Sequence, residues 1–300
     1  MTRLGVLVNP TAAGGRGARA GAATVDRLRR RGHDVRVLTR ADTVTPGDRT
    51  HGLDAVVAVG GDGTVHAALA LTAGTGVPLG IVPAGSGNDV ARSLELPRGD
   101  VDGAVGRLED ALARGPRRVD AVRAGPPGAA TARWYVGVLS CGFDAAVSAR
   151  ALTLRHPQGG ARYVRAVAAE LARFAPYGYR VTIDDGEVWQ SAGTLVAVAN
   201  APRFGGGIRI APDAALDDGL LDVVVAGPVT RRGIAALLPG AYAGRHVRHP
   251  AVRVLRGRRI LVEADAGSGP APPPAFADGE PLGPLALEVE VRAGALAVLA

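Results

Sequence analysis

The stretch with the clearest chemical potential is residues 56–66, where an apolar run ends in glycines around a single aspartate, Asp62. An Ala/Leu-rich segment at 67–71 follows at once, so the order predicts a buried strand, a tight turn and a helix. Glycine lets the backbone approach a ligand, and the first N–H groups of a helix favour an anion. A carboxylate repels a phosphate unless a metal lies between them. The stretch therefore indicates a nucleotide–Mg²⁺ site; the alternative is a plain turn with Asp62 as a helix cap.

Two further glycine-rich loops follow predicted strands. Residues 9–17 come after an apolar run at 3–8, and residues 83–89 come after one at 78–82. Because strands and helices alternate here, we expect a doubly wound parallel sheet, in which ligands bind at the carboxyl ends of the strands. The remaining runs are strand-like at 35–38 and 117–123, and helical at 18–31, up to about 94, and at 101–114.

The basic residues, 35 in all, are exclusively arginines. A chain without lysine cannot build a Walker-type phosphate loop, a protein-kinase catalytic lysine or a Schiff base. Any phosphate must therefore be held by backbone N–H groups, hydroxyls, arginine or a metal. The net charge of +7 suits anionic partners such as a nucleotide, a nucleic acid or an acidic membrane surface.

The single cysteine, Cys141, cannot form an internal disulfide or a cysteine zinc site, which fits a reducing cytosol. The chain opens on a strand-like run with no signal-peptide pattern, and no apolar stretch approaches the ~18 residues that span a membrane. We expect a cytoplasmic protein, with peripheral contact at the inner membrane face left open.

The pattern changes near residues 125–128, Gly-Pro-Pro-Gly, where we place a domain boundary. Beyond it, short strand-like runs and an Asp-Asp-Gly hairpin signal at 184–186 indicate an antiparallel β-sandwich with a few helices. The expected organisation is an N-terminal doubly wound α/β nucleotide domain at 1–125 and a C-terminal antiparallel β-sandwich domain at 126–291. The strand-like runs are 134–139, 179–183, 188–190, 195–199, 221–225, 252–255, 260–263, 285–291 and 296–299; the helical pieces are 145–152, 163–174 and 230–238.

The three loops and several later motifs together resemble the diacylglycerol kinase catalytic-domain family, soluble bacterial lipid kinases related to sphingosine and ceramide kinases. One Gly-Gly-Asp-Gly-Thr is shared with NAD kinases and phosphofructokinases, but the ordered set is far more specific. In that family the last strand can return to the first domain, which here would be residues 292–300. The later motifs are 142–145, 199–200, 205–207, 216–222 and 278–280.

The resemblance implies an ATP- and Mg²⁺-dependent kinase acting on a lipid hydroxyl, with diacylglycerol to phosphatidic acid as the default reaction and an NAD kinase-like or other small-molecule kinase as the alternative. Asp62 would act near the catalytic Mg²⁺. Arg16 stands where relatives often carry lysine, which leaves its role open. The residues that match ATP-binding positions are Asn9, Pro10, Thr11, Thr39, Gly60, Gly61, Asp62, Gly63, Thr64, Gly85 and Ser86.

Two acidic loops of the second half match further positions of the family. Asp278 matches the general base and Glu280 its companion, which completes a catalytic set with Asp62. Residues 214–222 match a structural Mg²⁺ loop, in which the carbonyls of Ala215 and Leu220 and the carboxylate of Asp218 would hold the ion. Without the family resemblance, both loops would be ordinary turns.

Two other function classes stay open. Residues 15–20 fit the G-x-G-x-x-A pattern of dinucleotide-binding oxidoreductases, with Arg40 placed to meet a 2′-phosphate, but the expected ribose-binding acid is missing. Residues 231–259 hold eight arginines and no acid, which suits a solvated face or a non-catalytic module for nucleic acid or membrane. The few aromatic residues argue against single-strand stacking, so we expect a lipid partner and no nucleic acid. His66, His246 and His249 have no partner residues at the spacing of a metal site, so we expect them to be structural.

Overall fold

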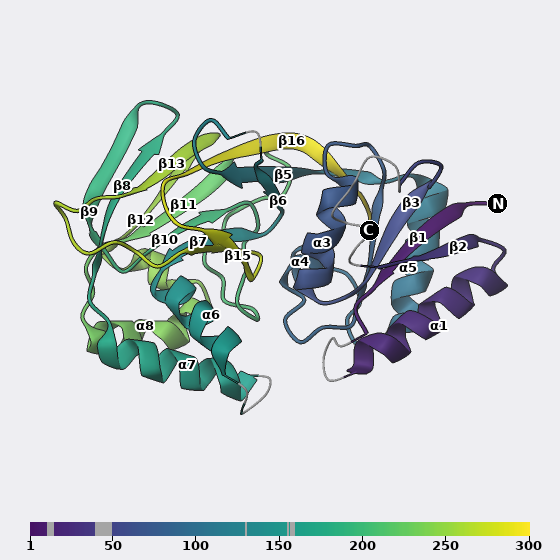
Figure 1. Ribbon diagram of the computed structural model, residues 1–300, viewed down its shortest axis with the longest axis horizontal. Coiled ribbons are helices and arrows are strands. Elements are labelled where there is room, and N and C mark those ends of the chain that lie inside the picture. Colours follow the sequence, from purple (N-terminus) through teal and green to yellow (C-terminus); the bar gives the residue numbers. More distant parts are fainter. Residues whose placement is uncertain (11–14, 40–49, 130, 155, 157–159) are drawn as a thin grey trace. The chain divides into compact units, whose positions relative to one another are not determined.

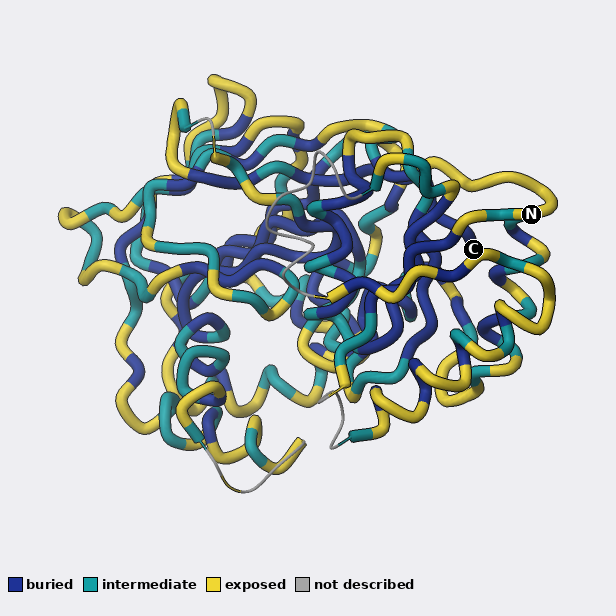
Figure 2. Tube along the Cα trace, turned by 45° about the vertical axis from the view of Figure 1, so that its right-hand side comes forward, coloured by how far each residue is buried: buried dark blue, intermediate teal, exposed yellow. Residues whose placement is uncertain are grey.

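The computed structural model describes residues 1–10, 15–39, 50–129, 131–154, 156 and 160–300. These residues form two compact units (Figure 1). The N-terminal unit comprises Met1–Ala121 together with Arg292–Ala300, and the C-terminal unit comprises Val122–Val291. In both units the strands form the buried interior, drawn in dark blue in Figure 2, while loops and outer helix faces are exposed. Within the described residues, no helix has the length and apolar character needed to cross a membrane.

The N-terminal unit is built on a parallel sheet, as the alternating pattern predicted. Its strand order is β2–β1–β3–β4, and the last residues of β16 add a fifth parallel strand beside β4, with Val298 opposite Leu79. The strands are fully apolar where both faces are covered, as in β3. Their bounds are β1 Arg3–Val8, β2 Asp34–Leu38, β3 Ala55–Gly60, β4 Leu79–Pro83 and β16 Leu287–Leu299.

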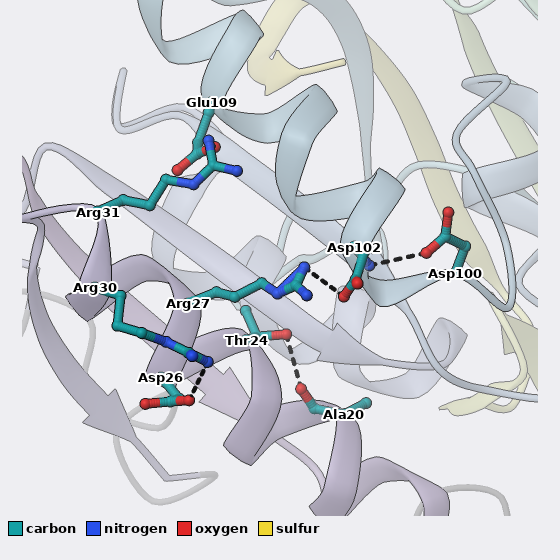
Figure 3. Close-up of polar contacts among 9 residues, drawn as sticks. All are labelled: Ala20, Thr24, Asp26, Arg27, Arg30, Arg31, Asp100, Asp102 and Glu109. Atoms are coloured by element: carbon teal, nitrogen blue, oxygen red, sulfur yellow. Dashed lines mark hydrogen bonds and ion pairs between the residues drawn. The ribbon is translucent and has the colours of Figure 1, made fainter.

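Helices α1 and α5 share one hydrophobic cluster with this sheet, and α3 packs against β3. Ion pairs from Arg27 to Asp102 and from Arg31 to Glu109 also join α1 to α5 (Figure 3). The Asp100 carboxylate caps α5 by accepting the N–H of Asp102 at 3.0 Å. The helix bounds are α1 Arg16–Arg30, α3 Asp62–Thr72, α4 Asp89–Ser93 and α5 Val101–Arg114.

The C-terminal unit is an antiparallel β-sandwich. One sheet has the order β12–β11–β10–β7–β14–β15, and the facing strands run β16–β13–β8–β9, with β5 and β6 beside β16. Inward side chains from both sets, such as Val196 and Ile260, meet in one apolar core. The bounds are β5 Arg117–Gly125, β6 Arg133–Tyr135, β7 Val138–Gly142, β8 Tyr177–Ile183, β9 Glu187–Gly193, β10 Leu195–Ala199, β11 Leu221–Ala226, β12 Val252–Gly257, β13 Arg259–Ala264, β14 Ala275–Ala277 and β15 Glu280–Gly283.

Three helices lie together on one side of the C-terminal unit (Figure 1). They share a satellite core that includes Phe143, Ala166 and Ile234. Their bounds are α6 Phe143–Thr153, α7 Gly160–Arg173 and α8 Arg231–Ala241, and the short 3₁₀ helix η3 Arg245–Arg248 follows α8.

Strand boundaries in the C-terminal unit differ from the sequence prediction in three places. The predicted strand 134–139 is two strands, β6 and β7, because the backbone turns at 136–137. The predicted strands 285–291 and 296–299 are one strand, β16, which continues into the N-terminal unit. Within it, Gly294 has a φ of 60° and donates its N–H to Asp120 at 2.8 Å. The short β14 and β15 were not predicted. The Asp-Asp-Gly hairpin is confirmed between β8 and β9, with Asp184 and Asp185 both at positive φ.

Candidate functional site

Three loops meet at the carboxyl edge of the parallel sheet. The N–H of Asn9, after β1, donates to the carbonyl of Val59 at 3.4 Å. After β4, the N–H groups of Ala84 and Gly85 both donate to the carbonyl of Gly60, at 2.8 and 3.2 Å. The loops after β1, β3 and β4 are therefore hydrogen-bonded to one another through β3.

The second and third of these loops touch backbone to backbone at Gly61 and Gly85. A Cβ atom on Gly85 would lie 2.3 Å from the Cα of Gly61, and one on Gly61 would lie 3.1 Å from the Cα of Gly85. No side chain fits at Gly85 without moving main chain, so glycine is required there by close approach. Asn88 fixes the same loop: its Oδ1 accepts from the Gly85 N–H at 3.1 Å and its Nδ2 donates to the Gly85 carbonyl at 2.9 Å.

The carboxylate of Asp62 lies between these two loops. Asp62 is the first residue of α3, whose N-cap is Gly61, and its Oδ1 accepts the N–H of Val90 at 3.3 Å. A Cβ on Gly87 would lie only 2.8 Å from Oδ2. Asp62 thus joins the start of α3 to the short helix α4 and does not cap its own helix.

Burial raises the pKa of Asp62, and backbone N–H groups around Val90 act in the opposite direction. Keeping the Asp62 carboxylate ionised therefore costs free energy, and a nearby cation would lower that cost. The hydroxyl oxygen of Thr64 is also buried and has no hydrogen-bond partner within the described residues. A buried carboxylate and a hydroxyl are the hard oxygen donors that suit Mg²⁺, so the residues present fit that ion.

The other described residues predicted to bind ATP lie in the loops after β1, β2 and β4 and in the first turn of α3. Gly63 is in the first turn of α3, and Ser86 is exposed at the tip of the third loop. Asn9 is half-buried, while Pro10 and Thr39 are exposed after β1 and β2. Thr11 and Arg40 lie outside the described residues. Arg16 is the first residue of α1.

In the C-terminal unit, Asp278 occupies the turn between β14 and β15 with a φ of 50°. Its Oδ2 accepts the N–H of Val136 at 2.9 Å, and its Oδ1 accepts those of Gly137 and Val138 at 2.9 and 3.1 Å. Hydrogen bonds to a carboxylate favour its charged form and fix its orientation. Glu280 follows at the start of β15, half-buried.

Two further residues complete this arrangement: Asn200, which belongs to the predicted motif at 199–200 but was given no role, and Gly137, which was not predicted. Asn200 is fully buried; its Nδ2 donates to the carbonyl of Val136 and its N–H to that of Gly137, both at 2.9 Å. Gly137 is enclosed, since a Cβ there would lie 2.5 Å from Oδ1 of Asp278. The sequence signal for Asn200 was the Ala-Asn motif; Gly137 gave none.

The predicted structural Mg²⁺ loop at 214–222 is acidic and joined to one arginine. Asp218 accepts the N–H of Leu220 at 3.0 Å through Oδ1 and pairs with Arg256 through Oδ2. Arg256 also lies 3.4 Å from Asp222. Across the described residues, no group of three or more His, Cys, Asp or Glu side chains is placed to hold a metal ion. Ala215 and Leu220 are half-buried in the same loop.

The environment of the Asp222 carboxylate supports a cation at this loop. Its side chain is 5% exposed, and its Oδ2 has no hydrogen-bond partner in the described part of the chain. Burial raises the pKa of Asp222; Arg256 acts against this, while Asp218 and Asp213 add to it. A divalent ion would supply the missing positive charge, so these donors also fit Mg²⁺.

The described chain thus combines a parallel α/β unit, with glycine-rich loops joined at the carboxyl edge of its sheet, and a β-sandwich unit. The comparisons specify the family. Residues 3–124 match the diacylglycerol kinase catalytic domain, and residues 137–300 match the YegS C-terminal NAD kinase beta sandwich-like domain. The chain belongs to the diacylglycerol kinase catalytic-domain family, a family of phosphotransferases.

Relatives along nearly the whole chain agree with this assignment. A diacylglycerol kinase of Mycobacterium tuberculosis is 34% identical over 98% of this chain and 93% of its own length. A probable YegS-like lipid kinase of Xanthomonas oryzae is 34% identical over 71% of each chain. Among solved structures, a diacylglycerol kinase from Bacillus anthracis aligns with a TM-score of 0.70 at 20% identity, over 99% of this chain and 96% of that one. An NAD kinase from Archaeoglobus fulgidus shares the fold at a TM-score of 0.53 and 14% identity, over 100% of this chain and 94% of that one.

Proposed function

We propose that this protein transfers the γ-phosphate of ATP to the hydroxyl group of a lipid, with diacylglycerol as the first candidate acceptor and phosphatidic acid as the product. The observation that carries the proposal is the backbone contact between Gly61 and Gly85 with the Asp62 carboxylate beside it. The names of the relatives supply the acceptor class: a diacylglycerol kinase and a probable lipid kinase.

The nucleotide side of the reaction is assigned to the loops after β1, β3 and β4. Backbone N–H groups near Gly61 and Gly63 would bind phosphate oxygens, because glycine at these positions keeps side chains away. Asp62, with Thr64, would hold Mg²⁺, which neutralises charge on the triphosphate when it is bound. The remaining members of the proposed ATP-binding set are Asn9, Pro10, Thr11, Thr39, Gly60, Gly85 and Ser86.

The acceptor side is assigned to Asp278, with Glu280 as its neighbour. Three backbone N–H groups orient the Asp278 carboxylate, so it can align the lipid hydroxyl and accept its proton as the oxygen attacks the γ-phosphorus in line. The bond from the γ-phosphorus to the bridging oxygen breaks, and ADP leaves with that electron pair. Asp218, Asp222 and the carbonyls of Ala215 and Leu220 would hold a second, structural Mg²⁺.

An acceptor-panel assay tests this proposal directly. Purified protein would be incubated with γ-labelled ATP, Mg²⁺ and, in separate reactions, diacylglycerol, ceramide, a sphingoid base, monoacylglycerol and NAD. Label in phosphatidic acid supports the proposal, and label in another lipid changes only the substrate. Label only in NADP would favour the NAD kinase-like alternative, which rests on the shared fold. No labelled lipid from any acceptor would contradict the proposal.

Family membership favours a kinase over a dinucleotide-dependent oxidoreductase or a non-catalytic binding module. The proposed setting is the cytoplasmic side of the membrane, because the acceptor is a membrane lipid while the donor is a soluble nucleotide. Fractionation of the native host should place the protein in the cytosolic and peripheral membrane pools, with the membrane pool released by salt. Extraction only by detergent would contradict a peripheral association.

A further inference from the structure

The chain beyond strand β10 is hydrogen-bonded to the turn that holds Asp278. Strand β10 pairs antiparallel with β7, and the residues that follow it meet the turn before β7. The Nδ2 of Asn200 donates to the carbonyl of Val136 at 2.9 Å. The carbonyl of Gly137 accepts two backbone N–H groups, from Asn200 at 2.9 Å and from Ala201 at 3.1 Å. Asn200 therefore contacts two consecutive carbonyls of this turn.

Each of these carbonyls belongs to a peptide group whose N–H donates to Asp278. The carbonyl of Val136 shares its peptide group with the N–H of Gly137, which lies 2.9 Å from Oδ1. The carbonyl of Gly137 shares its peptide group with the N–H of Val138, which lies 3.1 Å from the same oxygen. Two chains of hydrogen bonds thus run from Asn200, through one peptide group each, to the carboxylate.

The contacts of Asn200 should strengthen the hydrogen bonds that the turn gives to Asp278. A hydrogen bond accepted by a peptide carbonyl polarises the peptide group and strengthens the bond that its N–H donates. The effect is larger in a low-dielectric interior, and Asn200 has 0% exposure. A buried amide costs free energy unless it is hydrogen-bonded, so an apolar residue would serve mere packing at lower cost. The amide at this position therefore indicates a role in orienting the turn.

The turn is fixed on both sides and packs directly against the carboxylate. On its N-terminal side, the hydroxyl of the fully buried Tyr135 donates to the carbonyl of Val198 in β10 at 3.2 Å. At its centre, a Cβ atom on Gly137 would lie 2.5 Å from Oδ1 of Asp278, which leaves no space between the turn and the carboxylate. The N–H of Asp278 also donates to the carbonyl of Val138 at 3.1 Å. A shift of the turn would therefore move the carboxylate with it.

We propose that Asn200 is a positioning residue for phosphotransfer, which fixes residues 136–138 and thereby directs the Asp278 carboxylate toward the acceptor hydroxyl. This role rests on the proposed function, because it takes Asp278 as the group that accepts the hydroxyl proton. Asn200 exchanges no proton in that step and acts only through the two peptide groups. Since a misplacement of about 1 Å can cost ~10²-fold in rate, this indirect contact should be visible in kcat.

Steady-state kinetics of Asn200→Ala and Asn200→Val test this role at a temperature where circular dichroism shows the variants folded. Both variants remove the Nδ2 donor and keep the backbone N–H, and valine leaves the smaller cavity. We expect kcat to fall ~10²-fold while the KM for ATP changes less than about two-fold, because only the carboxylate is misplaced. In an Asp278→Ala background, Asn200→Ala should lower kcat by less than about two-fold further, since its effect needs the carboxylate. An equal loss in both backgrounds, or wild-type kcat in the Asn200 variants, would overturn the proposal.

Thr194→Ala is the matched control, because it removes buried side-chain hydrogen bonds next to the other end of β10. The Thr194 hydroxyl donates to the carbonyl of Gly227 at 2.8 Å and accepts the N–H of Val229 at 3.2 Å. The variant should lower Tm by a few degrees, like Asn200→Ala, but change kcat by less than about two-fold. A kcat loss equal to that of Asn200→Ala would mean that general loosening of the sandwich, not the position of Asp278, lowers the rate, and would overturn the proposal.

Hydrogen exchange followed by NMR, without lipid or nucleotide, tests the contact itself. In wild type and Thr194→Ala, the amides of residues 136–138 should exchange slowly. In Asn200→Ala they should exchange at least ~10-fold faster, while those of the β8–β9 hairpin do not change. Fast exchange at 136–138 in wild type would overturn the proposal even if no Asn200 variant folds. Slow exchange there in a wild-type protein that labels no lipid would contradict the proposed function, yet support Asn200 as the residue that fixes the turn.

Discussion

Asp62 and Asp278 are aspartates at the ends of apolar strands, but the two units give them different surroundings. In the N-terminal unit, parallel strands end at one edge, so Asp62 lies among loops. Burial raises its pKa, and backbone N–H groups around Val90, one of them 3.3 Å from Oδ1, act in the opposite direction. In the C-terminal unit, Asp278 sits in a tight turn and accepts three N–H groups from 136–138. Within the described residues, Asp62 forms no ion pair, so it suits a cation, whereas the Asp278 carboxylate is held by three backbone N–H groups.

The largest effect is expected from Asp62→Asn. The amide keeps an oxygen for the Val90 N–H but removes the charge that would hold Mg²⁺, which is worth several kcal/mol. We therefore expect kcat to fall by at least about 10⁴-fold. The melting temperature should stay the same or rise slightly, because the charge is buried at a cost. A folded Asp62→Asn protein with normal activity would refute the assignment.

Asp278→Asn should lower both activity and stability. A lost general base costs ~10²–10⁴-fold in rate. In addition, both carboxylate oxygens accept backbone N–H groups, so the new NH₂ must face a donor, and an unsatisfied buried group costs about 1–3 kcal/mol. Denaturant unfolding of Asp278→Asn beside Asp62→Asn measures the difference. If both variants are equally stable, the three-amide cradle does not stabilise the turn.

Asp144 tests the effect of burial on a carboxylate of the C-terminal unit, because both of its carboxylate oxygens are buried. Burial raises its pKa to about 6, although Ser140 and nearby backbone N–H groups act in the opposite direction. The folded state therefore binds more protons than the unfolded state between about pH 4 and 6, so this group makes stability fall as pH rises through that window, by at most ~3 kcal/mol. Asp144→Asn should remove that part of the decline, as measured by urea unfolding at pH 5 and 7. An unchanged pH dependence would place the pKa near its ordinary value.

The smallest effect is expected at Asp218. Without Mg²⁺, Asp218→Ala loses a partly exposed pair with Arg256, worth ~0–1 kcal/mol. With Mg²⁺ at ten times its Kd, wild type should gain ~1.4 kcal/mol and a few degrees in Tm, and the variant should not. Differential scanning fluorimetry with and without Mg²⁺ measures both. A wild-type Tm that ignores Mg²⁺ would contradict the structural ion.

The sequence was most informative where periodicity and glycine act locally. The run at 101–114 matches α5 and the run at 195–199 matches β10, because each has the period of its element and clear stop signals. The loops around Asp62 were predictable because parallel strands must end at one edge. The cradle of Asp278 was not, since Val136, Gly137 and Val138 are more than a hundred residues away in sequence and donate through backbone atoms that carry no side-chain signal.

Tertiary contacts also determine which arginines of a basic segment are paired with acidic residues. The arginines of 231–259 look alike in sequence, but the acids that pair with Arg253 and Arg259 come from the distant hairpin around Asp184–Asp185 and β9. No local pattern reveals which arginines are neutralised. The same holds for Asp222, whose burial follows from its strand and not from the turn chemistry of residues 216–219.

The central claim is a division of labour, in which Asp62 serves the nucleotide and its metal while Asp278 serves the acceptor hydroxyl. Isothermal titration calorimetry with a non-hydrolysable ATP analogue, with and without Mg²⁺, tests it on wild type and on both asparagine variants. We predict that Asp278→Asn binds the analogue with wild-type affinity and Mg²⁺ dependence although lipid phosphorylation collapses, whereas Asp62→Asn loses the Mg²⁺-dependent part of binding. If Asp278→Asn instead loses nucleotide affinity and keeps its turnover per bound ATP, Asp278 belongs to the metal site and the division of labour is wrong.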